Sequence, residues 1–226
     1  MFNQPQITTL KLPEGIKIDP VYYDAEYYAG LPKSNWDKPY TWENMKNTFY
    51  MWAKFVLTAF PDAGSFLNVG CARGFLERAV LETVAHNGKK MPEWLGFDVS
   101  HYAIANAEEK AKPLIQQTDI DEFIFPHVFD VLLCLDVLEH LTEKQLRRFL
   151  HRSRQYVNDC GFFYVATDSK INRLEPSHIT MKSREWWNTL FIESGWTQND
   201  ETREFERLTK NFLPESDSEP FIYLSR

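Results

Sequence analysis

The stretch Ser65–Leu76 constrains the fold of this chain more than any other part of it. An apolar run at Phe66–Val69 fits a buried strand, and the residues that follow Gly74 have the apolar spacing of a helix. Three small residues interrupt these patterns: Gly70, Ala72 and Gly74. The stretch therefore predicts a strand, a tight turn and a helix. Such a turn lets a ligand approach the backbone and the unpaired N–H groups of the helix N-terminus.

The spacing of these small residues argues against two common nucleotide sites. A dinucleotide fingerprint has glycine-type residues at relative positions one, three and six, whereas Phe75 occupies the sixth position here. A phosphate-binding P-loop ends in Gly-Lys-Ser or Gly-Lys-Thr, and neither occurs in the chain. A nicotinamide cofactor and a P-loop are therefore disfavoured, and a purely structural turn stays open as an alternative.

A second strand is expected at Trp94–Asp98, and Asp98 ends it. Ser100 then suits the N-cap of a helix expected over His101–Lys112. In a doubly wound sheet, an acid in this place faces the ribose of a nucleotide bound at the first turn and can accept from both hydroxyls. The alternative is an aspartate that only forms the turn ahead of the helix.

The remaining patterns alternate between helix and strand. Thr41–Phe60 has the apolar spacing of an amphipathic helix, and Phe129–Leu135 is almost continuously apolar, as a central strand buried on both faces is. Two more strands are expected, at Leu114–Gln117 and Gly161–Ala166. Two more helices are expected, one from the capping box at Thr142 to about Val157 and one from Ser183 to Gly195. At the end, the chain from Trp196 onward and Phe221–Leu224 are expected to form an antiparallel hairpin, joined by Pro214–Pro220.

With these features in place, the chain resembles the class I S-adenosylmethionine (SAM) dependent methyltransferases. Four segments carry the resemblance: Leu67–Gly74, Gly96–Ser100, Phe129–Leu141 and His178–Trp196. The resemblance implies a Rossmann-like, doubly wound α/β sheet that is mostly parallel, with an antiparallel C-terminal hairpin. It also implies SAM as the cofactor and S-adenosylhomocysteine (SAH) as its product. The chain departs from the family at Asn68, where an acid is usual, and at Ala72, where a glycine is usual.

The resemblance also implies which residues contact the cofactor. They are Asn68, Gly70, Cys71, Ala72, Gly74, Asp98, Val99, Asp119, Ile120 and Asp136. Asp119 would lie beside the adenine amino group and Ile120 would pack against the ring, although the acids at Asp121 and Glu122 leave this register open. Asp136 would stand at the carboxyl end of the central strand, where open α/β sheets hold their ligands.

We expect two parts in the chain. Residues 1–60 form an N-terminal arm and an aromatic helical lid, and residues 61–226 form the SAM-binding methyltransferase domain. The arm over residues 1 to about 20 is polar and lacks periodicity, so we expect it to be flexible. Four tyrosines between Val21 and Tyr28 suit a lid over the ligands, and covering of the sheet edge is the equally open alternative.

The composition limits the class of methyl acceptor and the cellular compartment that we expect. The net charge of −7 and the pI near 5.4 argue against a nucleic-acid backbone as substrate, because phosphate contacts need clustered Lys and Arg. The three cysteines have no paired spacing, which favours a reducing cytoplasm. No apolar run reaches the length of a membrane span. We therefore expect a soluble, cytoplasmic protein with a small-molecule acceptor, and we leave monomer and homodimer both open.

For methyl transfer the protein mainly has to align the acceptor, exclude water and remove a proton. Two histidines are candidates for the base because imidazole titrates near neutrality. His178, on a loop that overhangs the site, is the preferred base. His140 follows the central strand, and orientation of the adjoining loop is the alternative role for it.

A divalent metal ion is an alternative that the residues leave open. Asp136, Glu139 and His140 are spaced so that they would share one face of a helical turn, and His178 could join them. Similar sets hold an ion in small-RNA 3′-end methyltransferases and some quinone O-methyltransferases. Because the Glu-His pair also occurs in metal-free relatives, we predict no metal.

The sequence thus predicts a SAM-dependent enzyme that methylates an oxygen, or else a nitrogen, of a small molecule such as a sugar or secondary metabolite. A catalytically silent SAM-binding scaffold is the alternative, motivated by Asn68 and Ala72. An RNA methyltransferase is a weaker alternative, because the chain is acidic.

Overall fold

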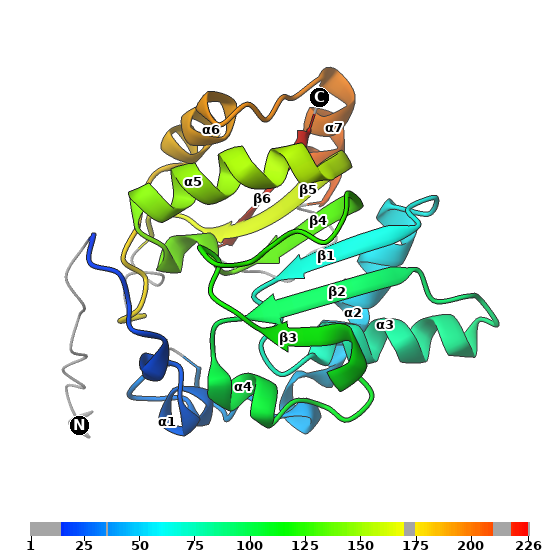
Figure 1. Cartoon of the computed structure of the whole chain (residues 1–226), viewed down its shortest axis with the longest axis vertical. Coiled ribbons are helices and arrows are strands. Elements are labelled where there is room, and N and C mark those ends of the chain that lie inside the picture. Colours follow the sequence, from blue (N-terminus) through cyan, green and yellow to red (C-terminus); the bar gives the residue numbers. More distant parts are fainter. Residues whose placement is uncertain (1–14, 35, 170–174, 210–217, 226) are drawn as a thin grey trace, which may run out of the picture.

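A six-stranded sheet organises the chain in a computed structural model, which describes residues 15–34, 36–169, 175–209 and 218–225. The strands are β1 (Ser65–Val69), β2 (Glu93–Asp98), β3 (Ile115–Gln117), β4 (Phe129–Leu135), β5 (Val157–Ala166) and β6 (Ser218–Leu224). Their order is β3-β2-β1-β4-β5-β6, and only β6 runs antiparallel to its neighbour (Figure 1). The expected fold class, a mostly parallel doubly wound sheet, is confirmed.

Helices cover both faces of the sheet (Figure 1). The described helices are α1 (Ala25–Ala29), α2 (Trp42–Ala59), α3 (Phe75–His86), α4 (His101–Ala105), α5 (Glu143–Ser153), α6 (Arg184–Glu193) and α7 (Asp200–Thr209). Short 3-10 turns lie at Pro20–Tyr22, Lys112–Leu114, Leu138–His140 and Arg154–Tyr156. Helices α2, α3 and α7 lie on one face, and α5 and α6 lie on the other. None of the helices in the described ranges is long and apolar enough to cross a bilayer.

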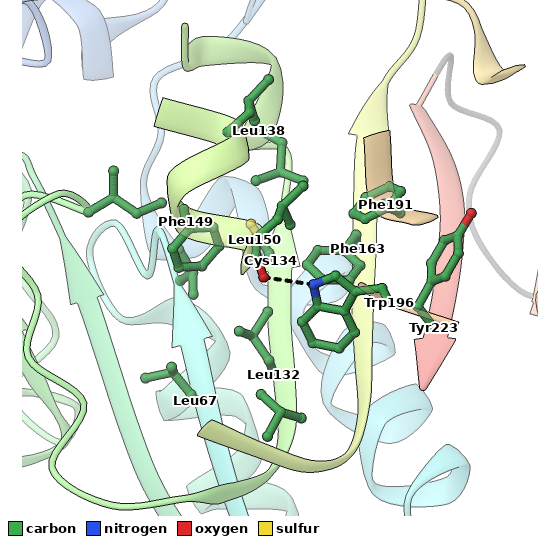
Figure 2. Close-up of a cluster of buried hydrophobic side chains, with 14 of the residues drawn as sticks. Leu67, Leu132, Cys134, Leu138, Phe149, Leu150, Phe163, Phe191, Trp196 and Tyr223 are labelled. Carbon is green, nitrogen blue, oxygen red and sulfur yellow. Dashed lines mark hydrogen bonds between the residues drawn. The ribbon is translucent and has the colours of Figure 1, made fainter. Parts of the chain in front are cut away.

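Alternate residues of the buried strands supply two cores, one on each face of the sheet. On the α5 and α6 face, Leu132 and Cys134 of β4 pack with Phe163 of β5 beneath the helices (Figure 2). Trp196 is fully buried there, and its indole N–H donates to the backbone oxygen of Leu150 at 3.0 Å. This hydrogen bond ties the chain that follows α6 to the end of α5.

On the opposite face, α2 lies directly on the sheet. Its buried Trp52 packs edge-on against Phe162 and Tyr164 of β5. Val56 belongs to the same cluster, as the amphipathic spacing of Thr41–Phe60 predicts. The aromatic residues of the N-terminal segment extend this core toward the carboxyl ends of the strands.

One expected helix is much shorter than predicted. The helix expected over His101–Lys112 ends at Ala105, because the Asn106 side chain caps the carbonyl of Tyr102 and the backbone turns away. The nitrogen of Glu108 then donates to the carbonyl of Arg73, so this segment packs on the turn after β1. The tertiary contact therefore overrides the helical pattern.

The C-terminal hairpin is built differently from the expectation. The antiparallel partner of β6 is β5, paired from Cys160↔Leu224 to Ala166↔Ser218. Within residues 197–209, the chain after Trp196 contributes an isolated bridge between Thr197 and Leu224, and then forms α7, which was not predicted from the sequence. The pairing of a Trp196 strand with Phe221–Leu224 was therefore wrong.

Smaller boundaries also differ. The capping box at Thr142 and Gln145 is present, but α5 ends at Ser153, and Val157 begins β5 instead of ending the helix. Several expectations lie outside the described residues: the flexible arm over residues 1–14, residues 170–174 of the overhanging loop, and 214–217 of the stretch before β6.

Candidate functional site

A cavity of about 290 Å³ opens at the carboxyl ends of β1, β2 and β4. The blue N-terminal segment in Figure 1 lies at this end of the sheet, to which the strand arrowheads point. It contributes an aromatic wall of Tyr23, Tyr27, Tyr28, Trp36 and Tyr40. The cavity lies where parallel α/β sheets hold their ligands, and its size approaches that of small-molecule sites.

The turn between β1 and α3 forms the floor of the cavity. Gly70 and Gly74 have φ angles of +74° and +72°, which side chains rarely adopt. A Cβ on Gly70 would collide with the side chain of Val137, and one on Gly74 would lie 2.5 Å from the Cβ of Ala111. The two glycines are therefore required both by conformation and by space.

Asp98 ties the end of β2 to this turn. One carboxylate oxygen accepts from the backbone nitrogen of Ala72 at 2.8 Å, and the other accepts from that of Ser100 at 2.7 Å. Burial raises the pKa of Asp98, and these backbone donors oppose the rise. The side chain lines the cavity together with Val99.

Asn68 on β1 also lines the cavity, and its side-chain nitrogen donates to Glu77 of α3 at 2.6 Å. Glu77 has no solvent exposure and does not appear in the sequence expectations. Its position in the first turn of α3, directly after the small residues that follow β1, is the signal that could have identified it.

Asp119, which the resemblance places beside the adenine, forms an ion pair in the structure. Lys17 donates to Asp119 at 2.7 Å and lies 3.4 Å from Asp121. Lys17, Asp119 and Ile120 all line the cavity. Because Lys17 is about half exposed, this pair is weak, and a ligand amino group can compete for the carboxylate.

Asp136 follows β4 and has a φ of +51°, a conformation that aspartate tolerates better than most residues. It lines the cavity, and its carboxylate accepts from the hydroxyl of Ser218 at 2.6 Å. Desolvation by the surrounding protein raises the pKa of Asp136 to about 6, although the Ser218 hydrogen bond opposes the rise.

Glu139, His140 and His178 form a compact cluster beside Asp136. Their ligand atoms lie within 4.8 Å of one another, and no metal-binding group in the described residues includes Asp136. The expectation that Asp136 shares this face was therefore wrong, because the positive φ at Asp136 breaks the helical turn before Leu138–His140. The two imidazole rings meet edge-on, with centroids 4.8 Å apart.

The histidines occupy different depths. His140 lines the cavity and approaches the ring of Tyr23, and its Nδ1 lies 3.1 Å from the carbonyl of Ser177. His178 is buried behind it, with Nε2 at 3.9 Å from Glu139. Burial and the neighbouring His178 hold the pKa of His140 well below its usual value.

Glu139 is fully buried at the base of this cluster. One of its carboxylate oxygens accepts from the nitrogen of Ala166, and the other has no hydrogen-bond partner within the described ranges. Burial raises the pKa of Glu139 well above its usual value. The cluster can therefore hold a proton or a cation, and Glu139, His140 and His178 offer the donor atoms that such an ion needs.

Comparison with known proteins identifies the type of domain. Residues 66–161 match the family model of a methyltransferase domain. No curated protein matches the chain. Among solved structures, a SAM-dependent methyltransferase from Archaeoglobus fulgidus has a TM-score of 0.57 at 16% identity, over 79% of this chain and 94% of that one.

Two further solved structures are similar. Magnesium protoporphyrin IX methyltransferase from Synechocystis, with bound SAH, has a TM-score of 0.55 at 14% identity, over 80% of this chain and 84% of that one. The plantazolicin methyltransferase in complex with SAH has a TM-score of 0.54 at 15% identity, over 81% of this chain and 86% of that one. At these identities the structural likenesses show the fold.

Proposed function

We propose that this chain is a SAM-dependent methyltransferase that transfers the methyl group to an oxygen, or else a nitrogen, of a small-molecule acceptor. The single observation that carries the proposal is the continuity of the cavity. One space is lined by the glycine turn, by Asp98 and Asp136, and by His140. Cofactor, acceptor and a neutral base can therefore meet in it.

We propose that the cofactor lies along the ends of β3, β2 and β1. The cavity wall offers Asp119 and Ile120 after β3, and Asp98 and Val99 at the end of β2. At β1 it offers Asn68 and the glycine turn. The first pair suits an adenine, an acid at the end of β2 suits the ribose hydroxyls, and the helix N-terminus after the turn suits a carboxylate. The amino-acid part of SAM would then face β1 and β4.

The remaining part of the cavity suits the acceptor. Its wall toward α2 is lined by Met45, Phe49 and Trp52, which favours an apolar body on the substrate. Asp136 and His140 line the same cavity and supply ionisable side chains to it. This combination supports a small acceptor that carries a hydroxyl or amine on an apolar frame.

We propose His140 as the group that takes the acceptor proton. Its Nδ1 is close to the Ser177 carbonyl, so Nε2 is the nitrogen left to accept a proton. The depressed pKa of His140 keeps the ring neutral at physiological pH, as a base must be. His178, which touches His140 from behind, would orient the ring or receive the proton in turn.

The aromatic segment would act as a lid. Tyr23 lies against His140, and the hydroxyl of Ser100 donates to the backbone oxygen of Tyr23 at 2.5 Å, so this residue contacts the segments that follow both β4 and β2. We propose that residues 1–60 serve as arm and lid and residues 61–226 as the methyltransferase domain. Within the described part, however, α2 packs as a fixed layer on the sheet. We therefore propose residues 15–34 and 36–40 as the moving part of the lid.

A panel of acceptors, with SAH formation as the readout, tests this function. Hydroxyl and amine compounds with and without an apolar ring are incubated with SAM, and His140→Asn is the matched control. The proposal predicts turnover of ring-bearing hydroxyl or amine compounds, with a large loss in the variant. Turnover of structured RNA alone, weakened by salt, would replace the small-molecule proposal with the RNA alternative.

A divalent ion at Glu139, His140 and His178 is a second candidate, supported by the close approach of their ligand atoms. In that arrangement the ion, instead of an imidazole, would lower the pKa of an acceptor hydroxyl. Activity measured after chelation and again after addition of magnesium or manganese separates the two. The base proposal predicts no change, whereas loss in chelator and recovery with metal would favour the ion.

A further inference from the structure

A buried carboxylate lies directly behind the cavity wall. Glu77 has no solvent exposure, and its Oε1 accepts from the Asn68 side-chain nitrogen at 2.6 Å and from the Trp94 indole nitrogen at 3.0 Å. Gly96, which pairs with Asn68 across β1 and β2, leaves room for it. A Cβ on Gly96 would lie 2.8 Å from the same carboxylate oxygen. Residues of β1 and β2 thus contact this one carboxylate of α3 directly.

Glu77 lacks a positive partner within the described ranges of the chain. Its Oε2 has no hydrogen-bond partner, and no Lys, Arg or His forms an ion pair with it there. Burial raises the pKa of Glu77, and its two hydrogen bonds oppose the rise. A cation placed nearby would therefore favour the ionised form of this acid, and the ionised acid would in turn favour the cation.

Asn68 connects this acid to the cavity. Because its amide nitrogen donates to Glu77, the carbonyl oxygen is the acceptor that this side chain can offer to a ligand in the cavity that Asn68 lines. A carbonyl oxygen accepts hydrogen bonds and so suits an ammonium donor. The Glu77 contact therefore decides which end of the amide a ligand meets.

We propose that Glu77 is a positioning residue for the cofactor: it orients the Asn68 amide toward the ammonium group of SAM and supplies the negative charge that this ammonium requires. The inference rests on the proposed cofactor position, in which the amino-acid part of SAM faces β1. It explains how the pocket holds a cation although Asn68 itself is uncharged. The acid would then act from α3, one layer behind the strand.

Calorimetric titration with two ligands tests the role of Glu77. SAH carries the ammonium group, and 5′-methylthioadenosine has the same adenosine but no amino-acid part. In Glu77→Gln, an uncharged amide of the same shape replaces the acid. We expect about a tenfold loss of SAH affinity, the usual size for one charge-assisted interaction. The affinity for 5′-methylthioadenosine should stay within about twofold of that of the unchanged protein.

Two further variants separate positioning from structural support. Trp94→Phe removes the other donor to the same oxygen and should leave both affinities unchanged. The double variant Asn68→Asp with Glu77→Gln moves the charge to the cavity wall, where the glutamine amide can donate to it. We expect it to restore SAH affinity, and thermal unfolding of each variant shows whether the fold is intact.

The outcomes distinguish this inference from the function on which it rests. Equal losses for both ligands, unchanged SAH affinity in Glu77→Gln, or no recovery in the double variant would each overturn the role of Glu77. If the unchanged protein binds neither ligand, the proposed cofactor position fails and the inference fails with it. A loss confined to SAH that the double variant reverses supports the proposal.

Discussion

The carboxylate of Asp98 holds the backbone of Ala72 in the left-handed region. The nitrogen of Ala72 donates to Asp98 at 2.8 Å, and Ala72 has a φ of +46°. A side chain with a Cβ is strained in this conformation by about 1–2 kcal/mol. The hydrogen bond from β2 therefore keeps a strained residue in the middle of the turn between β1 and α3.

Replacement of Ala72 by glycine should stabilise the protein slightly. Relief of the left-handed strain favours the variant, and the greater freedom of glycine in the unfolded chain opposes it by about 0.4–1 kcal/mol. We expect a net gain of up to about 1 kcal/mol in the free energy of unfolding, measured in urea. As a control, Ala85→Gly in exposed helical backbone of α3 should lose up to about 1 kcal/mol. A loss in both variants would contradict strain at Ala72.

Removal of the proposed base should affect turnover and leave cofactor binding unchanged. We expect His140→Asn to lower kcat by about 10²–10⁴, the range typical of general base catalysis, while the affinity for SAH is kept. Because the pKa of His140 is depressed, the acid limb of kcat/KM should lie below pH 6.5 in the unchanged enzyme. A kcat for His140→Asn within twofold of the parent value would exclude this role.

Stability should depend on pH through Asp136. Its pKa is about 6 in the folded protein, whereas the usual value for an aspartate, which applies to the unfolded chain, is 3.8. The folded form therefore takes up a proton at a higher pH than the unfolded chain does. The contribution of Asp136 to stability therefore rises as pH falls from above 6 toward 4, and ionised Asp136 is destabilising at pH 8. We expect Asp136→Asn, which also tolerates positive φ, to raise Tm at pH 8. The gain should disappear below about pH 4, and a gain that is equal at both pH values would contradict the shifted pKa.

The buried indole of Trp196 should contribute strongly to folding. Trp196→Phe removes the hydrogen bond to Leu150 and part of a fully buried side chain. We expect a loss of about 2 kcal/mol in the free energy of unfolding. Trp186→Phe on α6, where the ring is partly exposed, is the matched control and should change stability by less than about 0.5 kcal/mol. Equal losses would contradict a specific role for the Trp196 hydrogen bond.

The strands and the turn between β1 and α3 could be predicted from the sequence because their signals are local. The strand, small residues and helix of Ser65–Leu76 are all present, and α3 spans Phe75–His86. The helix expected over His101–Lys112 failed because Glu108 bonds to Arg73, a contact between distant segments that no local pattern contains. Helix α7 was missed because its sequence is strongly polar and has few apolar residues to mark a buried face.

The site residues also divide into those that a local pattern predicts and those that depend on contacts between distant segments. The sequence placed Gly70, Asp98 and His140 on one ligand site, and all three line the cavity. It could not show that Lys17 reaches Asp119, because the two residues are 102 positions apart. Nor could it show that Glu77 lies behind Asn68, since that contact depends on how α3 is rotated against β1. The cofactor contacts themselves stay predictions.

The proposed cofactor site is tested by a calorimetric titration with SAH on the unchanged protein and on Asp98→Ala. SAH has the adenosine and amino-acid parts of the cofactor and no methyl group to transfer. We expect a dissociation constant in the micromolar range, which is a binding free energy of about 8 kcal/mol, and loss of this binding in Asp98→Ala while the fold is retained. Absence of binding to the unchanged protein, or equal binding to the variant, would contradict a cofactor site at the ends of β1 and β2.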